Sequence, residues 1–213
     1  MPEPPVPAGL DSAGARPESV GLDPAGARPA QSRLDCADTP AVPTGPGAPD
    51  IAPTPSAEQF RRAAARYATG IAVVTTRVEG VDHAMTANSF TTVSLDPLLA
   101  LVCVERESRI HTAVLAAGVW SVSFLPAGAQ DTARWFATRG RDLTGQFDRV
   151  ATRRGHNGCV LLADGLAGLE LRTEQVLPAG DHDIVLGAVT SVHEPHDEGG
   201  PLVYYASAFH ALA

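Results

Sequence analysis

The sequence predicts a mainly β protein, an antiparallel barrel with peripheral helices. Short runs rich in Val, Ile and Thr recur between residues 71 and 205. Turns or single helices separate these runs, and several runs follow one another closely enough to form hairpins. A doubly wound parallel sheet would need a helix between almost all consecutive strands, so the pattern favours the antiparallel barrel.

The first predicted helix covers residues 56–70. Ser56 is followed three residues later by Gln59, which is the spacing of a capping box. Phe60 and Tyr67 recur at helical spacing, and Gly70 provides a natural end. The folded part of the chain is therefore expected to begin at this helix.

The later elements are predicted in the same way. A run of β-branched or alternating apolar residues predicts a strand, and apolar residues three or four apart predict a helix. Ser108 and Gly118 mark the start and the end of one such helix. The elements expected in order are strands at 71–78, 83–90 and 98–104, a helix at 108–118, a strand at 119–125, a helix at 128–140, and strands at 169–177, 182–194 and 201–205.

Residues 1–55 differ in kind from residues 56–213. They contain 13 of the 18 prolines and no Phe, Trp or Tyr. Such a segment cannot bury enough apolar surface to offset the entropy of ordering it. The sequence therefore predicts a disordered tail at 1–55 and one folded domain at 56–213.

Composition excludes several function classes. The formal net charge is −8, and all 16 basic residues are Arg. This balance argues against non-specific nucleic-acid binding. The chain has no apolar run long enough to span a membrane and no secretory signal at its start. Its three widely spaced cysteines form no disulfide or zinc pattern. We therefore expect a cytoplasmic protein without a membrane segment.

The motifs of common catalytic and metal sites are missing from the sequence. It contains no GxxxxGK[ST], no GxGxxG after a strand, no GxSxG and no HExxH. His193 and His196 lie near Asp197 and Glu198 in "HEPHDEGG", but this spacing is typical of a charged turn. No metal site is expected.

One stretch, "HAMTANSFTTVSLDPLLALVCV" at residues 83–104, places many short polar side chains before a very apolar strand. Small side chains allow a flat ring to lie close to the backbone, and hydroxyl and amide groups can bind its polar rim. A polar strand edge whose hydroxyls satisfy one another would have the same composition. The residues alone leave both interpretations open.

The ordered segments "GIAVVTT", "MTANSFTTVSLDP", "LVCV", "FA", "GDHDIVLGAV" and "PLVYY" resemble the flavin reductase family with the FMN-binding split-barrel fold. The resemblance covers residues 60–212. It implies an NAD(P)H:flavin oxidoreductase that reduces FMN or FAD and supplies reduced flavin to a separate monooxygenase. It also implies a homodimer and NADH or NADPH as hydride donor.

The resemblance also implies a flavin site. The flavin ring would contact the residues Met85, Thr86, Ala87, Asn88 and Ser89, with Asn88 giving hydrogen bonds to the polar edge of the ring. Ser94 would lie toward the ribityl and phosphate side, and Cys103 and Val104 would end the strand beneath the ring. Ser108 would start a helix whose N-terminus suits the phosphate. Ile110 stands where the family often has Thr, and Arg109 and Thr112 are the candidates to compensate.

The segment "GDHDIVLGAV" carries the second part of the implied site. His182 is the candidate for positioning the nicotinamide, with Asp183 and Tyr204 nearby. Phe136 and Phe147 match the Phe-Ala…Phe region over the flavin. From the residues alone, a turn histidine and core phenylalanines explain the same positions. Cys103 has no paired cysteine or evident activating base, so we expect an inert thiol.

The function expected is thus flavin reduction, in which the protein aligns nicotinamide and flavin and needs no strong general acid or base. The alternative is a flavin-binding electron carrier or binding protein without reductase turnover, and a structural β-barrel interaction domain is a third reading. The sequence does not distinguish FMN from FAD or NADH from NADPH, and it does not identify the partner oxygenase.

Overall fold

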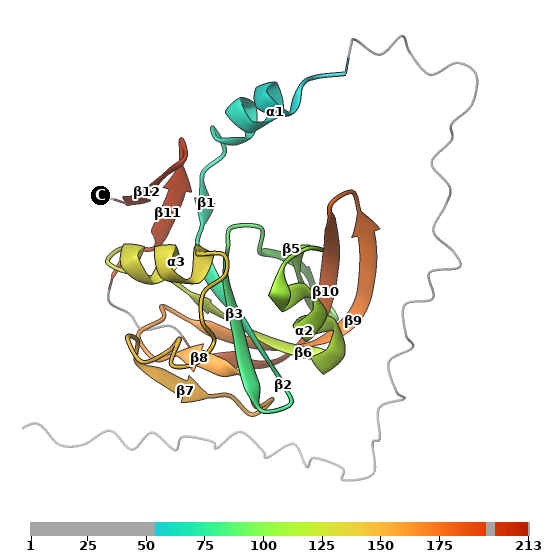
Figure 1. The fold of residues 1–213 in the computed structure, drawn as a ribbon, viewed down its shortest axis with the longest axis vertical. Coiled ribbons are helices and arrows are strands. Elements are labelled where there is room, and N and C mark those ends of the chain that lie inside the picture. Colours follow the sequence, from blue (N-terminus) through green and yellow to red (C-terminus); the bar gives the residue numbers. More distant parts are fainter. Residues whose placement is uncertain (1–53, 195–198, 213) are drawn as a thin grey trace, which may run out of the picture. The chain divides into compact units, whose positions relative to one another are not determined.

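The computed structural model describes residues 54–194 and 199–212 (Figure 1). The helices within these ranges are α1 (Ala57–Ala64), α2 (Arg109–Ala117) and α3 (Gln130–Ala137). The strands are β1 (Thr69–Gly70), β2 (Ala72–Val78), β3 (Val81–Ala87), β4 (Thr91–Leu95), β5 (Leu98–Glu105), β6 (Val119–Phe124), β7 (Thr152–Arg154), β8 (Val160–Leu162), β9 (Gly168–Ala179), β10 (His182–His193), β11 (Leu202–Tyr205) and β12 (Ala208–Ala211).

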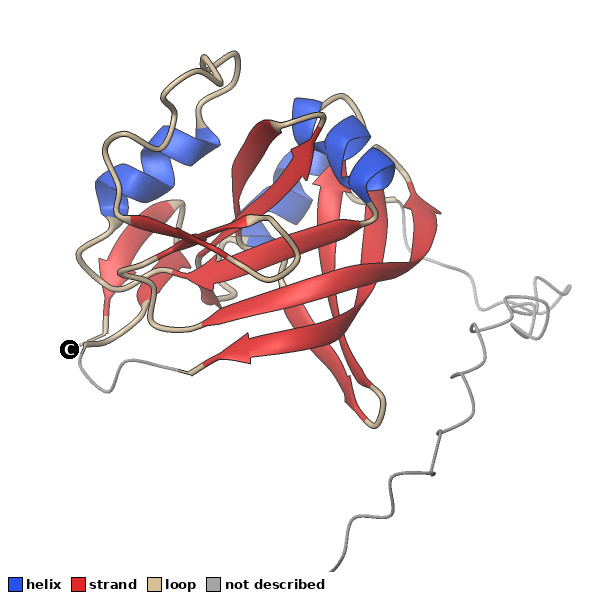
Figure 2. Ribbon diagram, turned by 90° about the horizontal axis from the view of Figure 1, so that it is seen from below, coloured by secondary structure: helices blue, strands red, loops and turns tan. Residues whose placement is uncertain are grey.

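Seven strands form the central sheet in the order β3-β2-β6-β9-β10-β5-β4. Every strand pairing among the described residues is antiparallel, as the sequence predicts. The sheet curls strongly around one of its faces (Figure 2). Its edge strands β3 and β4 are joined by residues 88–90 alone, so this connection crosses the open side of the barrel.

The inner face of the curled sheet holds the main core. Val74 on β2, Val102 on β5 and Val185 on β10 belong to the same buried cluster, although β2 and β5 lie near opposite edges of the sheet. Helix α2 adds its buried Ile110 and Val114 to this cluster. Because contacts across the inside join both halves of the sheet, the fold is a barrel and not an open sheet.

The opposite face of β2 and β3 supports a second core. Val73 and Ala84 point to this side because neighbouring residues of a strand face opposite ways. Ala133 and Phe136 of α3 cover them. The three-stranded sheet β1-β11-β12 contributes Leu202 to the same cluster, and β7 and β8 form a separate pair. Helices α2 and α3 thus pack on opposite faces of β2 and β3 (Figure 1).

The first helix has the predicted start and an earlier end. The Ser56 hydroxyl accepts a hydrogen bond from the Gln59 N–H, and the Gln59 side chain accepts one from the Ser56 N–H, which completes the capping box. The helix ends at Ala64 and does not reach Gly70. Thr69 and Gly70 instead pair with β11 as strand β1, so ladder hydrogen bonds replace helical ones there.

Other differences from the predicted elements are local. Helix α2 has Ser108 at its N-cap position, but the Ser108 hydroxyl donates to the Glu105 carbonyl (2.6 Å) and caps no N–H group. The return strand β3 ends at Ala87 and not at residue 90. The short strands β4, β7, β8 and β12 were not predicted.

Helix α1 presents an apolar surface to solvent. Phe60 is 68% exposed and Tyr67, just beyond the helix, is 76% exposed. No residue of α1 is buried against the described part of the chain. No helix within residues 54–194 and 199–212 is long and apolar enough to cross a membrane. The predicted tail at 1–55 lies almost wholly outside the described residues.

Gly187 gives a test of the barrel core. A Cβ atom at this position would lie 2.9 Å from Cζ2 of the fully buried Trp120 and 3.2 Å from the Arg172 carbonyl oxygen. We expect Gly187→Ala to lower the free energy of unfolding by about 1–3 kcal/mol, because the core must shift to admit the methyl group.

Chemical denaturation measures this change. Gly128→Ala is the matched control, since a Cβ at Gly128 meets no atom within 4 Å. Equal midpoints for the two variants would contradict the proposed close packing at Gly187.

Candidate functional site

Ser89 fastens the connection between β3 and β4 to β5. Its hydroxyl donates to the Cys103 carbonyl (3.1 Å) and accepts from the Cys103 N–H (3.2 Å). The regular β4–β5 ladder ends two residues earlier, at the Thr91–Leu101 pair. One side chain therefore supplies the donor and the acceptor that a further backbone residue of the ladder would have supplied.

Asn88 directly precedes Ser89, which is hydrogen-bonded to Cys103, and is exposed. Within the part of the chain that the structure describes, its amide has no hydrogen-bond partner. It borders a cavity of about 480 Å³, whose other lining residues include Thr69, Gly70, Ala72 and Phe124. Small side chains and one free amide therefore meet at this cavity, which has the size of a small-molecule site.

The end of β5 meets the beginning of β10. Glu105 and His182 are direct partners in the ladder. The His182 Nδ1 lies 2.7 Å from the Asp181 carboxylate, and His182 is about two-fifths exposed at its side chain. Nδ1 is thus the protonated nitrogen in the neutral ring, and Nε2 remains available to a ligand. Hydrogen bonding to His182 holds the pKa of Asp181 below its usual value.

Helix α2 begins three residues after β5 and brings basic groups to the same end of the barrel. Because Ser108 caps no N–H group, the first turn of α2 is free of side-chain caps. Arg109 donates to the Arg141 carbonyl. Burial and the nearby Arg109 guanidinium lower the pKa of His83, and its buried Nδ1 has no partner among the described residues. A helix start beside these groups suits an anion.

The residues before Asn88 face other parts of the fold. Met85 and Ala87 contribute to the barrel core, and the Thr86 hydroxyl donates to the Ala133 carbonyl of α3 (2.6 Å). Within the predicted wall from Met85 to Ser89, only the Asn88 side chain is exposed. Of the other four residues, Met85, Thr86 and Ser89 are partly buried and Ala87 is buried.

Val104 and three aromatic residues of the predicted site lie in the cores. Val104 is 1% exposed inside the barrel. Phe136, which is 2% exposed, packs against Phe147 with ring centroids 5.2 Å apart in the second core. Tyr204 packs against Phe209 on the edge of that core. The structure does not bring these aromatic residues to the end of β5.

Ser94 lies at the opposite end of β5 from the start of α2. It pairs with Leu99 near the start of that strand, and its hydroxyl accepts from the Asp96 N–H. Leu99 and Glu105 are six positions apart along β5, which corresponds to about 20 Å. Antiparallel pairing thus places Ser94 away from the start of α2, and a contact between Ser94 and the flavin stays a prediction.

Cys103 and Asp183 have less direct roles than the resemblance implies. Burial raises the pKa of the Cys103 thiol, which agrees with an inert cysteine. The Asp183 carboxylate binds Arg106 (2.6 Å) and His111 (2.8 Å) and is 8% exposed. It is therefore occupied by protein partners.

Sequence reasoning missed several residues of this region. Arg139 forms two 2.7 Å hydrogen bonds with the Glu105 carboxylate, beside His182. Arg106 and His111 bind Asp183. Asp181 had a sequence signal, because it directly precedes His182. The other residues are distant in sequence from their partners, so no local spacing pointed to them.

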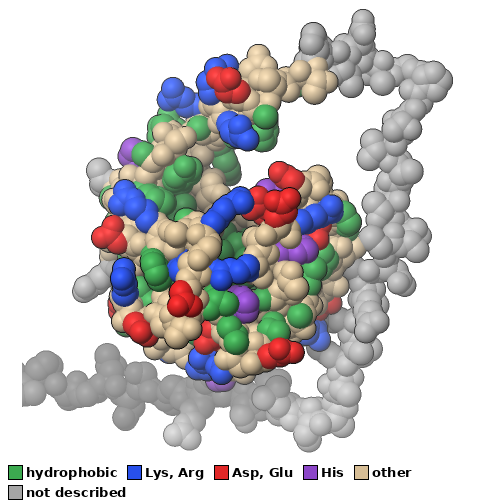
Figure 3. Space-filling view, viewed as in Figure 1, with side chains coloured by type: hydrophobic (Ala, Val, Ile, Leu, Met, Phe, Trp, Pro, Cys, Tyr) green, Lys and Arg blue, Asp and Glu red, His purple; other side chains and the backbone are tan. Residues whose placement is uncertain are grey.

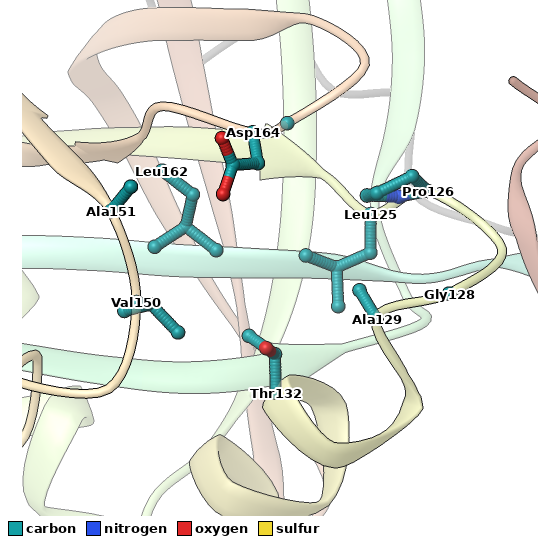
Figure 4. A pocket seen from close by; sticks show the side chains of 10 residues that line it. Leu125, Pro126, Gly128, Ala129, Thr132, Val150, Ala151, Leu162 and Asp164 are labelled. Atoms are coloured by element: carbon teal, nitrogen blue, oxygen red, sulfur yellow. The ribbon is translucent and has the colours of Figure 1, made fainter.

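Two other features lie apart from this site. A second cavity of about 260 Å³ lies between Leu125, Leu162 and the start of α3 (Figure 4). Asp164 and Thr132 face it, and none of the predicted site residues lines it. Elsewhere, His193 binds the buried Glu170 (2.7 Å), and residues 54–194 and 199–212 contain no metal-binding cluster. The other members of the "HEPHDEGG" turn, at 195–198, lie outside the described residues.

Acidic, basic and histidine side chains lie close together over the region of α2 and the neighbouring strand ends (Figure 3). The structure thus collects a free amide, a fixed histidine and a basic helix start around one end of β5. It joins Asn88, Ser89, Cys103, Ser108, Arg109 and His182 of the predicted residues.

Comparison with known proteins identifies relatives with the same fold. The NADH-dependent FMN reductase AsuE2 of Streptomyces nodosus subsp. asukaensis is 36% identical over 159 residues, which cover 74% of this chain and 86% of AsuE2. The crystal structure of BorF, the flavin reductase component of a bacterial two-component tryptophan halogenase, is 40% identical, with a TM-score of 0.70 over 74% of this chain and 98% of BorF.

A second solved structure contains ligands. The NADH:FAD oxidoreductase SgcE6 of Streptomyces globisporus C-1027, in complex with NAD and FAD fragments, is 35% identical. The match covers 73% of this chain and 92% of SgcE6, with a TM-score of 0.69. The family model described as "Flavin reductase like domain" matches residues 64–213, which is most of the chain. This protein therefore belongs to the flavin reductase family, with the split-barrel fold that its sequence predicts.

Proposed function

We propose that this chain is an NADH:flavin oxidoreductase that reduces FMN or FAD and passes the reduced flavin to a separate monooxygenase. The observation that carries the proposal is the arrangement at the end of β5, where His182 and the start of α2 lie on neighbouring segments. Relatives named NADH-dependent FMN reductase and NADH-dependent FAD reductase support the choice of NADH. Residues 56–213 carry this activity, and the cytoplasm, which supplies NADH, is the proposed location.

The residues present fit a flavin. The cavity beside Asn88 is about 480 Å³, and the free amide can hydrogen-bond the polar edge of a heterocycle. The uncapped first turn of α2 and Arg109 suit a phosphate. Burial and the nearby Arg109 guanidinium lower the pKa of His83, which lies close to this helix start.

The chain's own residues provide binding and alignment. Bound flavin supplies the acceptor for the hydride that NADH donates. Asn88 orients the ring edge, and the start of α2 holds the phosphate end. Asp181 fixes the His182 ring so that Nε2 faces outward to bind the nicotinamide. No residue needs to act as a strong acid or base, in keeping with the absence of a triad among the site residues.

Other reductases in the same family work beside an oxygenase. The Thermus thermophilus relative, 33% identical, is named the reductase component of 4-hydroxyphenylacetate 3-monooxygenase, and BorF serves a halogenase. These names support an oxygenase as the partner of this chain. A flavin-binding protein without turnover would share the Asn88 cavity but would not need a fixed histidine at the end of β5.

A homodimer is also part of the proposal. Apolar side chains remain exposed on α1 and on the edge strand β4, where Leu95 is 86% exposed. Exposed apolar patches and open strand edges are typical of association surfaces. We expect sedimentation velocity to give twice the 22.1 kDa mass of one chain. A fully active species with the mass of a single chain would overturn the dimer.

Asn88→Ala tests the ring-binding wall. It removes hydrogen bonds worth roughly 0.5–1.5 kcal/mol each, and more where a buried partner is left unsatisfied, so flavin affinity should fall about three- to a hundred-fold. Titration by fluorescence quenching measures the affinity. Thr152→Ala is the control, because Thr152 is an exposed residue of β7 outside the predicted site and its loss should leave the affinity unchanged. Unchanged affinity for Asn88→Ala would remove Asn88 from the site.

His182→Ala tests the hydride step. The wild-type protein should oxidise NADH when FMN or FAD is added, and the variant should reduce flavin more slowly or need more NADH. Flavin affinity should stay nearly constant, because His182 faces the outer side of the ring. Stopped-flow reduction measures the step, and His210→Ala serves as control, since His210 lies on β12 and its ring contacts the Tyr205 carbonyl of β11. Equal rates for the two variants would make His182 a structural turn histidine.

A further inference from the structure

Arg106 holds the residues on both sides of His182. Its backbone N–H donates to the Asp181 carbonyl (3.1 Å), and its Nε donates to the Asp183 carboxylate (2.6 Å). His182 lies between these two attachment points. The start of strand β10 is therefore fixed to the segment that follows β5 by more than its ladder.

Asp183 continues this connection to α2. Neighbouring residues of a strand face opposite sides, so Asp183 points away from His182, toward the inside of the fold. There its second carboxylate oxygen lies 2.8 Å from Nε2 of His111, in the first turn of α2. Both oxygens of an almost fully buried carboxylate are thus occupied, one by the β5–α2 connection and one by the helix itself.

We propose that Asp183 is a positioning residue that fixes His182 relative to the start of α2. This inference rests on the proposed function, in which His182 meets the nicotinamide and the start of α2 meets the flavin phosphate. Arg106, Asp183 and His111 connect these two places by direct contacts. The carboxylate touches neither ligand in this arrangement and acts through His182.

The carboxylate is well suited to this task. Hydrogen bonds from His111 and Arg106 keep the pKa of Asp183 below its usual value. The group therefore stays charged at neutral pH and accepts both bonds. Asparagine at this position would keep one oxygen for Arg106 but would present an N–H₂ group or a single shared oxygen to His111. The start of β10 would then keep its contact with Arg106 but lose its contact with His111 of α2.

Hydride transfer is sensitive to such a loss, because a misplacement of about 1 Å can cost a hundred-fold in rate. We expect Asp183→Asn to lower kcat/KM for NADH by about ten-fold, while flavin affinity changes by less than about three-fold. Stopped-flow reduction at varied NADH separates kcat from KM. Fluorescence quenching reports the flavin affinity of the same full-length protein.

Glu170→Gln provides a matched control. Glu170 is also a buried carboxylate on the β9–β10 hairpin, and it also binds a histidine, His193, at 2.7 Å. Its partner lies at the other end of β10 from His182. We expect this variant to lower the melting temperature without changing kcat/KM for NADH. Equal kinetic losses in Glu170→Gln and Asp183→Asn would mean that Asp183 acts only through stability, and would overturn the proposal.

A double-mutant cycle gives the decisive result. If Asp183 acts through His182, Asp183→Asn should change kcat/KM little in the His182→Ala background, so the two losses will not add. Additive losses would overturn the proposal. If His182→Ala itself has no effect, the proposed role of His182 fails and the positioning role fails with it. If only Asp183→Asn has no effect, the role of His182 stands and the positioning role alone is overturned.

If Asp183→Asn folds poorly, variants of its two partners, Arg106 and His111, test the proposal. Arg106→Gln leaves the backbone hydrogen bond to Asp181 and the Asp183–His111 pair in place, and the Arg106 side chain is 41% exposed. We expect it to fold and to lose several-fold in kcat/KM for NADH. His111→Gln, which keeps a donor toward Asp183, should restore most of the activity that His111→Ala loses. Wild-type kinetics in Arg106→Gln and equal activity of the two His111 variants would contradict the proposal.

Discussion

The hydroxyl of Ser89 makes the contact on which the site depends. The barrel has two edge strands, and the only chain between them, residues 88–90, must cross the open side. Ser89 binds both backbone groups of Cys103, so this crossing is fixed to β5 at the residue beside Asn88. The same strand then leads to Glu105, which pairs with His182, and on to α2. One side-chain contact thus sets where the free amide stands relative to the histidine and the helix.

The sequence predicted most of the fold because the relevant signals were local. β-Branched runs and alternation identified β2, β5, β6, β9 and β10, and a capping box located the start of α1. The signals failed where a partner distant in sequence decides the structure. Thr69 and Gly70 were expected to form the end of the first helix, but β11 offers them ladder hydrogen bonds. Strands as short as β7 and β12 carry too few residues to show a period of two.

The site was predicted less completely, for related reasons. Side chains alternate along a strand, so Thr86 is expected to face the side opposite to Met85 and Ala87. In the structure the Thr86 hydroxyl indeed binds a carbonyl of α3, outside the barrel core. The same rule separates His182 from Asp183, which share a motif but face opposite sides. A phenylalanine at position 136 is compatible with a contact to the flavin ring and with a place in the core. Its burial in the structure places it in the core. The contact between Glu105 and Arg139 joins residues 34 positions apart, so no spacing could reveal it.

The buried carboxylate–histidine pairs Glu170–His193 and Asp183–His111 have similar chemistry, so their chemistry alone does not tell which of them belongs to a site. Glu170 accepts the N–H groups of His156 and Asn157 as well as the His193 ring, and together they hold its pKa below the usual value although burial acts in the opposite direction. A Cβ at Gly155 would lie 2.8 Å from its carboxyl carbon, so the loop closes tightly around it. The partners of Glu170 are the loop residues His156 and Asn157 and the His193 ring. Asp183 instead binds Arg106 and His111, which adjoin the two places proposed to bind the nicotinamide and the phosphate, His182 and the start of α2. The two carboxylates are alike in burial and charge. A structural pair and a positioning pair therefore differ in their neighbours. Only the neighbours of Asp183 are proposed to contact the nicotinamide and the flavin phosphate.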